Sequence, residues 1–126
     1  MAASGCGKIR NSPTTLKSTK IMIRVNVFYP RKEGARFDWA YYLDKHMPMV
    51  NRKFGSAAKS VSVEQGMAGG TPGSPPSFVA MAHFTFDSVE AFQAAFAPHA
   101  AEILADIQNY TSIEPVMQIS DLKLAH

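Results

Sequence analysis

The segment 77–86 (Ser-Phe-Val-Ala-Met-Ala-His-Phe-Thr-Phe) restricts the possible folds more than any other part of the chain. In a strand, successive side chains point to opposite faces. One face would carry Phe78, Ala80, Ala82, Phe84 and Phe86, and the other Val79, Met81, His83 and Thr85. Both faces are largely apolar, so we expect both to be covered. Helices would cover one face, and the sheet of a second copy of the chain would cover the other.

Alternating apolar residues predict three further strands, at residues 21–29, 58–65 and 113–124. Pro30 would end the first strand. Pro115 would mark an edge or entry point of the last strand, and a bulge near Ser120 would reconcile its imperfect alternation. Residues 66–76 contain four glycines and three prolines and predict a loop.

Two helical regions lie between these strands. In the first, an apolar stripe passes through Trp39, Tyr42, Leu43, His46, Met49 and Val50. Pro48 predicts a kink or break near residues 46–48, with Met47 pushed out of the α region, and Gly55 predicts a C-cap. In the second region, Asp87 is the expected N-cap with Glu90 as its capping-box partner, and Pro98 begins a further helical segment.

The resulting order, β-α-β-β-α-β, predicts an α+β ferredoxin-like fold: an antiparallel sheet with helices on one face. We expect one domain over residues 21–126, preceded by a disordered basic head at residues 1–20. The head contains four of the 13 Lys and Arg residues and none of the ten Asp and Glu residues, so the rest of the chain is nearly neutral. Nucleic acid is therefore not an expected partner.

The head lacks the apolar centre of a secretory signal, and no apolar run is long enough to span a membrane. We therefore expect a cytoplasmic protein. The composition of the head fits a transit-like address and a start upstream of Met22 equally well. Cys6, the only cysteine, excludes an intrachain disulfide, and we expect no catalytic role for it.

The block 37–50 (Phe-Asp-Trp-Ala-Tyr-Tyr-Leu-Asp-Lys-His-Met-Pro-Met-Val) contains a Tyr-Tyr pair that leads into Lys-His-Met-Pro. This block is similar to the signature of the EthD family, and the stretches 86–88, 105–111 and 115–120 also resemble that family. The resemblance covers about residues 22–124. It implies a dimeric α+β barrel. The family is named for ethyl tert-butyl ether degradation, where the founding member accompanies an oxygenase system, so an oxygenase partner is possible.

His46 is the first candidate catalytic residue, because a neutral imidazole beside Tyr42 can transfer protons near physiological pH. Its alternative role is a packed histidine that bonds a carbonyl freed at the helix break. The resemblance favours the catalytic role. Asp106 would orient the histidine or act as a simple cap, and Tyr110 belongs with it in the family's Asp-x-x-x-Tyr-Thr stretch.

Trp39, Phe92, Tyr110, His83 and His99 are the candidate ligand-binding residues. Trp39 and Phe92 would line an apolar pocket, although aromatic residues at these spacings also build ordinary cores. His83 would face the ligand cleft or the dimer barrel, and His99 would face His46 across the cleft. The histidines lack the close spacing of a metal site, so no metal is expected. No Gly-x-Gly-x-x-Gly follows a strand, so no nicotinamide or other cofactor is expected.

Three functions remain open from the sequence. The first is a cofactor-independent isomerase, lyase or oxidoreductase in which His46 transfers a proton on a small apolar organic molecule. The second is a non-catalytic binding protein that delivers such a molecule to a partner oxygenase. The third is a haem-binding dimer with one axial histidine.

Overall fold

The computed structural model describes residues 22–125. The basic head and Cys6 lie outside the described residues. The order of elements is β-α-β-β-α-β, as predicted. The strands are β2 (Ile23–Pro30), β3 (Ser60–Gln65), β4 (Phe78–Phe86) and β5 (Val116–Asp121). They form one antiparallel sheet in the order β3-β4-β2-β5, which is the ferredoxin-like arrangement.

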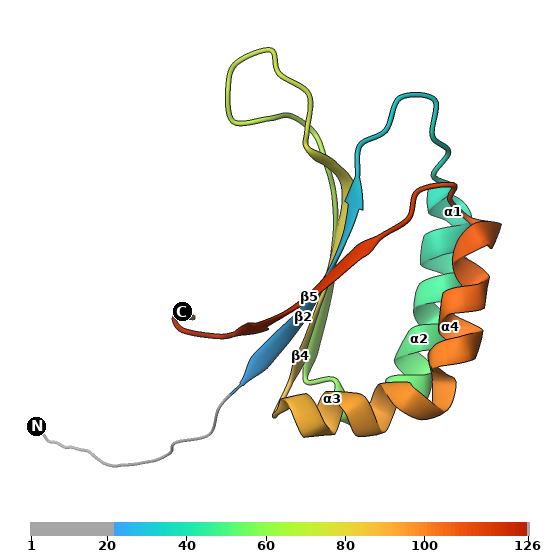
Figure 1. Cartoon of the computed structure of the whole chain (residues 1–126), viewed down its shortest axis with the longest axis vertical. Coiled ribbons are helices and arrows are strands. Elements are labelled where there is room, and N and C mark those ends of the chain that lie inside the picture. The colour runs from blue at the N-terminus through green and yellow to red at the C-terminus, as the bar shows by residue number, and fades with distance from the viewer. Residues whose placement is uncertain (1–21, 126) are drawn as a thin grey trace, which may run out of the picture.

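All helices lie on one side of the sheet (Figure 1). The first helical region comprises α1 (Trp39–Tyr41), a π-helical turn (Tyr42–His46) and α2 (Met47–Phe54). The second comprises α3 (Val89–Phe96) and α4 (Ala100–Asp106), with 3-10 turns at Ala97–His99 and Ile107–Asn109. The α2 helix runs beside α4, to which Lys53 is joined by an ion pair with Glu102, and α3 crosses one end of the sheet (Figure 1). The expected α+β class and one-sided helix layer are confirmed.

The core lies between the sheet and the helices. Ile23, Val25 and Tyr29 from β2 are buried there, with Ala82 and Phe84 from β4. The aromatic side chains of Phe54, Phe86 and Phe92 pack edge to face across this layer. Alternation of side chains along each strand therefore places the apolar set under the helices, as the sequence predicts.

Four local predictions are wrong. Ser88, not Asp87, caps α3, because its Oγ accepts a hydrogen bond from the Ala91 N–H at 3.0 Å. No bulge occurs at Ser120, since β5 pairs with β2 in continuous register from Val116 to Asp121. An irregularity instead lies in β4, where the register with β2 shifts between Tyr29 and Pro30. It brings the Phe78 ring to 5.2 Å from Phe28, on the sheet face away from the helices. The third wrong prediction is therefore the placement of Phe78 on the same face as Ala80 and Phe84.

The fourth correction concerns Pro48. The helix continues through this residue, and Met47 keeps α-helical dihedral angles, contrary to prediction. The irregularity lies one turn earlier, in the π-helical turn, where the Met47 N–H bonds to the Tyr42 carbonyl five residues back. The wider turn absorbs the effect of a proline that cannot donate a backbone hydrogen bond.

Candidate active site

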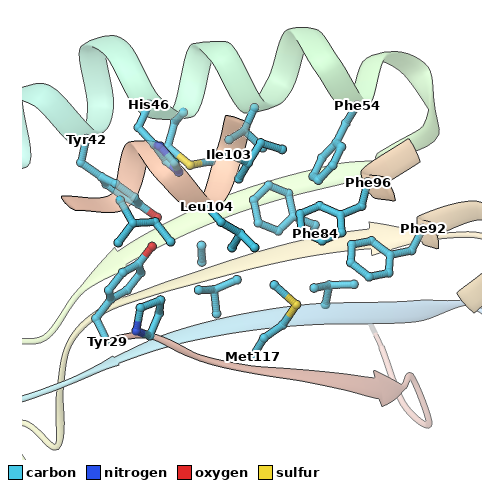
Figure 2. Close-up of a pocket in the computed structure, with 17 residues that line it drawn as sticks. Tyr29, Tyr42, His46, Phe54, Phe84, Phe92, Phe96, Ile103, Leu104 and Met117 are labelled. Carbon is cyan, nitrogen blue, oxygen red and sulfur yellow. The ribbon is translucent and has the colours of Figure 1, made fainter. Parts of the chain in front are cut away.

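An interior cavity of about 160 Å³ lies between the helix layer and the sheet (Figure 2). One end is aromatic and is formed by Phe54, Phe84, Phe92 and Phe96. At the other end the hydroxyls of Tyr29 and Tyr42 point toward one another, close to the His46 ring (Figure 2). The cavity is thus a mainly apolar chamber with polar groups gathered at one end, as in many small-molecule sites.

The cavity approaches the surface between α4 and β5. Leu104 and Met117 line it and are about half exposed, at 51% and 44%. A shallow surface groove on the outer side also includes Leu104, together with Ile107 and Pro115. Two flexible apolar side chains therefore form the boundary between this cavity and the solvent.

His46 is buried, and its two ring nitrogens meet different groups. Nδ1 lies 2.9 Å from Oδ2 of Asp106, and Nε2 lies 3.4 Å from the hydroxyl of Tyr110. The ring stacks on Tyr42 with centroids 5.6 Å apart. A carboxylate accepts only, so Nδ1 carries the hydrogen and Nε2 keeps its lone pair in the neutral imidazole. Nε2 is therefore the acceptor of the Tyr110 hydroxyl, and the His46 ring lines the polar end of the cavity.

Asp106 is held in place by three donors. Oδ1 accepts from the Tyr41 hydroxyl at 2.7 Å and from the Asn109 amide at 2.8 Å, while Oδ2 accepts from His46. Partial desolvation raises the pKa of Asp106, but the hydrogen bonds from Tyr41, Asn109 and His46 outweigh it, and the pKa falls below 3.8. Asp106 is therefore ionised at neutral pH.

Burial lowers the pKa of His46 below 6.5, although Asp106 acts in the opposite direction. His46 is consequently a neutral base at pH 7. Burial also raises the pKa values of Tyr29, Tyr42 and Tyr110 above their ordinary value of 10.0. These phenols remain protonated, and the Tyr29 and Tyr110 hydroxyls share a hydrogen bond of 2.7 Å.

The π-helical turn determines how His46 and Tyr42 are placed. A turn that is one residue wider rotates the side chains that follow it relative to an ordinary α-helix. Tyr42 and His46 are both buried and face the cavity, whereas Leu43 is half exposed and does not join the apolar stripe predicted for it. Irregular helical turns of this kind occur often at functional sites.

The structure brings five of the eight predicted site residues together. Tyr42, His46 and Phe92 line the cavity. Asp106 and Tyr110 are outside the cavity lining and contact the two ring nitrogens of His46.

The other three lie elsewhere. Trp39 packs edge-on against Tyr42 and does not line the cavity. His99 is in the 3-10 turn before α4, outside the cavity lining, and does not face His46 across it as suggested. His83 is on the opposite face of the sheet, where Nδ1 lies 2.7 Å from the side-chain oxygen of Asn26.

Three residues at the site were not among those predicted from the sequence. Tyr29 stands at the end of β2 on the face under the helices, and a polar tip on an apolar strand face could have indicated it. Tyr41 does not line the cavity, and its hydroxyl donates to Asp106. Asn109 lies three residues after Asp106, in the 3-10 turn that follows α4, and its amide donates to Asp106.

Two further structural findings apply to residues 22–125. In that range, no group of three or more His, Cys, Asp or Glu side chains is placed to hold a metal ion. None of the helices there is long and apolar enough to cross a membrane.

The fold and this site define a ferredoxin-like α+β domain with an interior apolar cavity and a buried histidine–carboxylate pair. Residues 34–114 match the EthD domain, which is most of the chain, so this protein belongs to the EthD family. No curated protein matches it.

Solved structures agree with this assignment. An EthD-like protein from Ralstonia eutropha is 56% identical, with a TM-score of 0.80, over 86% of this chain and 97% of that one. A hydroxynitrile lyase from Passiflora edulis is 17% identical, with a TM-score of 0.58, over 86% and 99%. A dimeric ferredoxin-like protein from Thermobifida fusca is 14% identical, with a TM-score of 0.51, over 85% and 96%. The last two show the shared fold alone.

Proposed function

We propose that this protein is a homodimeric, cofactor-independent enzyme that transfers a proton on a small apolar organic molecule in a catabolic or oxidative pathway. The observation that carries the proposal is the placement of His46. Its Nδ1 is tied to Asp106, its Nε2 contacts the Tyr110 hydroxyl, and its ring lines the polar end of an apolar cavity. A base whose pKa is near or below the working pH is unprotonated and ready to accept a proton.

The proposed roles follow from the contacts. His46 Nε2 takes a proton from the bound molecule and later returns it. Asp106 acts as a positioning residue, because it fixes the tautomer and stabilises the imidazolium that forms. The hydroxyls of Tyr29 and Tyr42 hold an oxygen of the substrate. These groups could support isomerisation, dehydration or elimination, and also oxygenation of a substrate that supplies its own electrons.

The homodimer is supported by the sheet face away from the helices. Phe28, Met81 and Val116 are aligned there across β4, β2 and β5. An antiparallel sheet with one face under helices usually presents a polar outer face, and a second sheet would remove these apolar groups from water. The related T. fusca protein is dimeric.

Deuterium wash-in tests the catalytic part. The protein is incubated in D2O with a panel of small neutral compounds that carry an acidic C–H bond, and NMR follows the loss of the C–H signal. We expect His46→Gln to slow wash-in by about a hundredfold or more. His99→Gln is the matched control, because this histidine lies outside the cavity, and it should retain the wild-type rate. Equal rates in wild type and His46→Gln would contradict the assignment.

A non-catalytic carrier is the second candidate, because the cavity lining is almost wholly apolar and could bind a molecule without chemistry. It would deliver its ligand to a partner oxygenase. This function predicts that His46→Gln binds ligands as wild type does and that neither protein catalyses wash-in. A haem-binding role is not supported at His46, because the cavity has about the volume of one small ring and leaves no room for a porphyrin.

A further inference from the structure

We propose that the cavity takes a neutral carbonyl compound about the size of one six-membered ring, with its oxygen between Tyr29 and Tyr42. The proposal rests on the proposed function and names its substrate class. The volume is the first support. A cavity of about 160 Å³ is close to the roughly 150 Å³ of an engineered apolar cavity that binds benzene. A fused bicyclic molecule would have to displace side chains.

The absence of a cation from the lining is the second support. Among residues 22–125 no Lys or Arg lines this cavity, and the Asp106 carboxylate contacts the His46 ring. An anionic ligand would lose its hydration, find no positive charge, and be repelled by Asp106. Carboxylates and phosphates are therefore disfavoured as substrates.

The hydroxyls at the polar end are the third support. Tyr29 and Tyr110 are joined by one hydrogen bond of 2.7 Å, which uses one of their two hydroxyl hydrogens. Tyr110 can donate its one hydrogen to His46 Nε2 or to Tyr29. When it donates to Tyr29, both the Nε2 lone pair and the Tyr29 hydrogen become available to a ligand. The Tyr42 hydroxyl points toward that of Tyr29 and hydrogen-bonds with it, so a ligand oxygen would replace Tyr29 as the acceptor of the Tyr42 hydrogen (Figure 2). A carbonyl oxygen can accept from both phenols and needs no hydrogen of its own.

The reaction at this site would be proton abstraction next to the carbonyl. His46 Nε2 takes the proton from the adjacent carbon, and the electrons of the broken C–H bond form a C=C bond as the carbonyl π electrons move to oxygen. Tyr29 and Tyr42 stabilise the oxyanion by hydrogen bonds, which strengthen as charge develops. Return of a proton from His46 to a carbon atom completes the step. No oxidant or other co-reactant is consumed.

A matched set of probes tests the proposal by calorimetric titration and by deuterium wash-in in D2O. Cyclohexanone is the expected ligand. Methylenecyclohexane has the same shape without the oxygen, 4-oxocyclohexanecarboxylate adds a negative charge, and 2-decalone adds a second ring. We expect each of the three to bind at least about tenfold more weakly than cyclohexanone. In the Tyr29→Phe/Tyr42→Phe double variant, cyclohexanone and methylenecyclohexane should bind alike. Tyr29→Phe and Tyr42→Phe are also measured singly, and thermal unfolding checks that each variant folds.

The outcomes separate this inference from the proposed function. If cyclohexanone binds selectively but gains no deuterium, the substrate class stands and the proton-transfer function fails. If the carboxylate probe gains deuterium as fast as cyclohexanone, proton transfer stands and the neutral substrate class is overturned. Equal binding of methylenecyclohexane and cyclohexanone to the wild type, or no binding of any probe, also overturns the inference.

Discussion

His46 is placed between two environments of opposite character. Nδ1 faces an ionised carboxylate, which would favour a charged imidazole, whereas the surrounding aromatic and aliphatic side chains disfavour it. Burial prevails, and the pKa of His46 lies below 6.5. A catalytic base benefits from this balance, since it is unprotonated at neutral pH yet oriented by a carboxylate.

The lowered pKa of His46 predicts how stability depends on pH. The unfolded chain takes up a proton at this residue near pH 6.5, while the folded protein does so only at lower pH. The stabilisation is therefore complete above 6.5 and is lost as pH falls toward the folded pKa. Urea unfolding should show that the free energy of unfolding falls more between pH 7.5 and pH 5.5 for wild type than for His46→Gln. Asp106 stays ionised at both pH values, because its pKa lies below 3.8, and so its titration does not contribute to the difference. Equal losses would contradict the burial argument.

Removing the charge of Asp106 should affect catalysis more than folding. In Asp106→Asn the amide no longer requires a hydrogen on Nδ1, so the tautomer with its hydrogen on Nε2 becomes populated. We expect deuterium wash-in to fall by about ten- to a hundredfold, less than the roughly 10⁴-fold loss in a serine-protease triad. Nitrogen-15 NMR of the imidazole provides a second measure. Asp44→Asn, an exposed acid in the same helical region, is the control and should change neither.

At the scale of elements, the spacing of apolar residues identified the strands and both helical regions, because the residues on the buried face of each element recur at regular intervals. This spacing could not decide between neighbouring residues that can form the same local hydrogen bond. Either Asp87 or Ser88 can cap α3, and only the backbone geometry selects Ser88. The π-helical turn was also unpredictable. A proline indicates that the helix is irregular nearby, but it does not fix whether the irregular turn comes before or after the proline.

The same limit applies to the site. The stripe through Tyr42 and His46 predicted that these residues face the core, and they do. Tyr29 joins them from β2 and Asp106 from the end of α4, and this meeting depends on the packing of elements distant in sequence. Contacts between elements that are distant in the chain produce no recognisable pattern in the local sequence. The resemblance to EthD proteins indicated Asp106, whereas in the sequence only the hydroxyl of Tyr29 distinguishes it from its apolar neighbours on the strand face.

The end of α2 offers a test of backbone strain. Gly55 has φ +57° and ψ −139°, a region that side-chain-bearing residues rarely adopt, and an added Cβ would meet no atom within 4 Å. Gly55→Ala should therefore destabilise the fold by about 1–3 kcal/mol through backbone strain alone. Gly70→Ala is the matched control, since its Cβ also meets nothing and its φ is not in the unfavourable range. Chemical denaturation measures both, and equal stabilities would contradict the strain argument.

For the whole molecule, the outer sheet face combines a polar row with an apolar one. Ser62, His83, Asn26 and Gln118 are aligned across the four strands, one from each. Asn26 is buried even in the single chain and is bonded to both His83 and Ser120. The adjacent row is formed by Met81, Phe28 and Val116. In the proposed dimer, the polar row would specify the alignment of the two sheets, and burial of the apolar row would stabilise their association.

A charge placed in the apolar row should therefore separate the proposed dimer. We expect a sedimentation mass of about twice the 13.8 kDa chain for wild type and of one chain for Met81→Glu. The carboxylate would be buried against the partner sheet without a counter-charge. Met67→Glu makes the same replacement at a methionine that is 92% exposed in the β3–β4 loop, and it should remain dimeric. If Met81→Glu unfolds, Val116→Glu on the edge strand provides the second variant, since Val116 is half exposed in the single chain. A wild-type monomer at micromolar concentration, or dimers of both outer-face variants, would show that this face is not the interface.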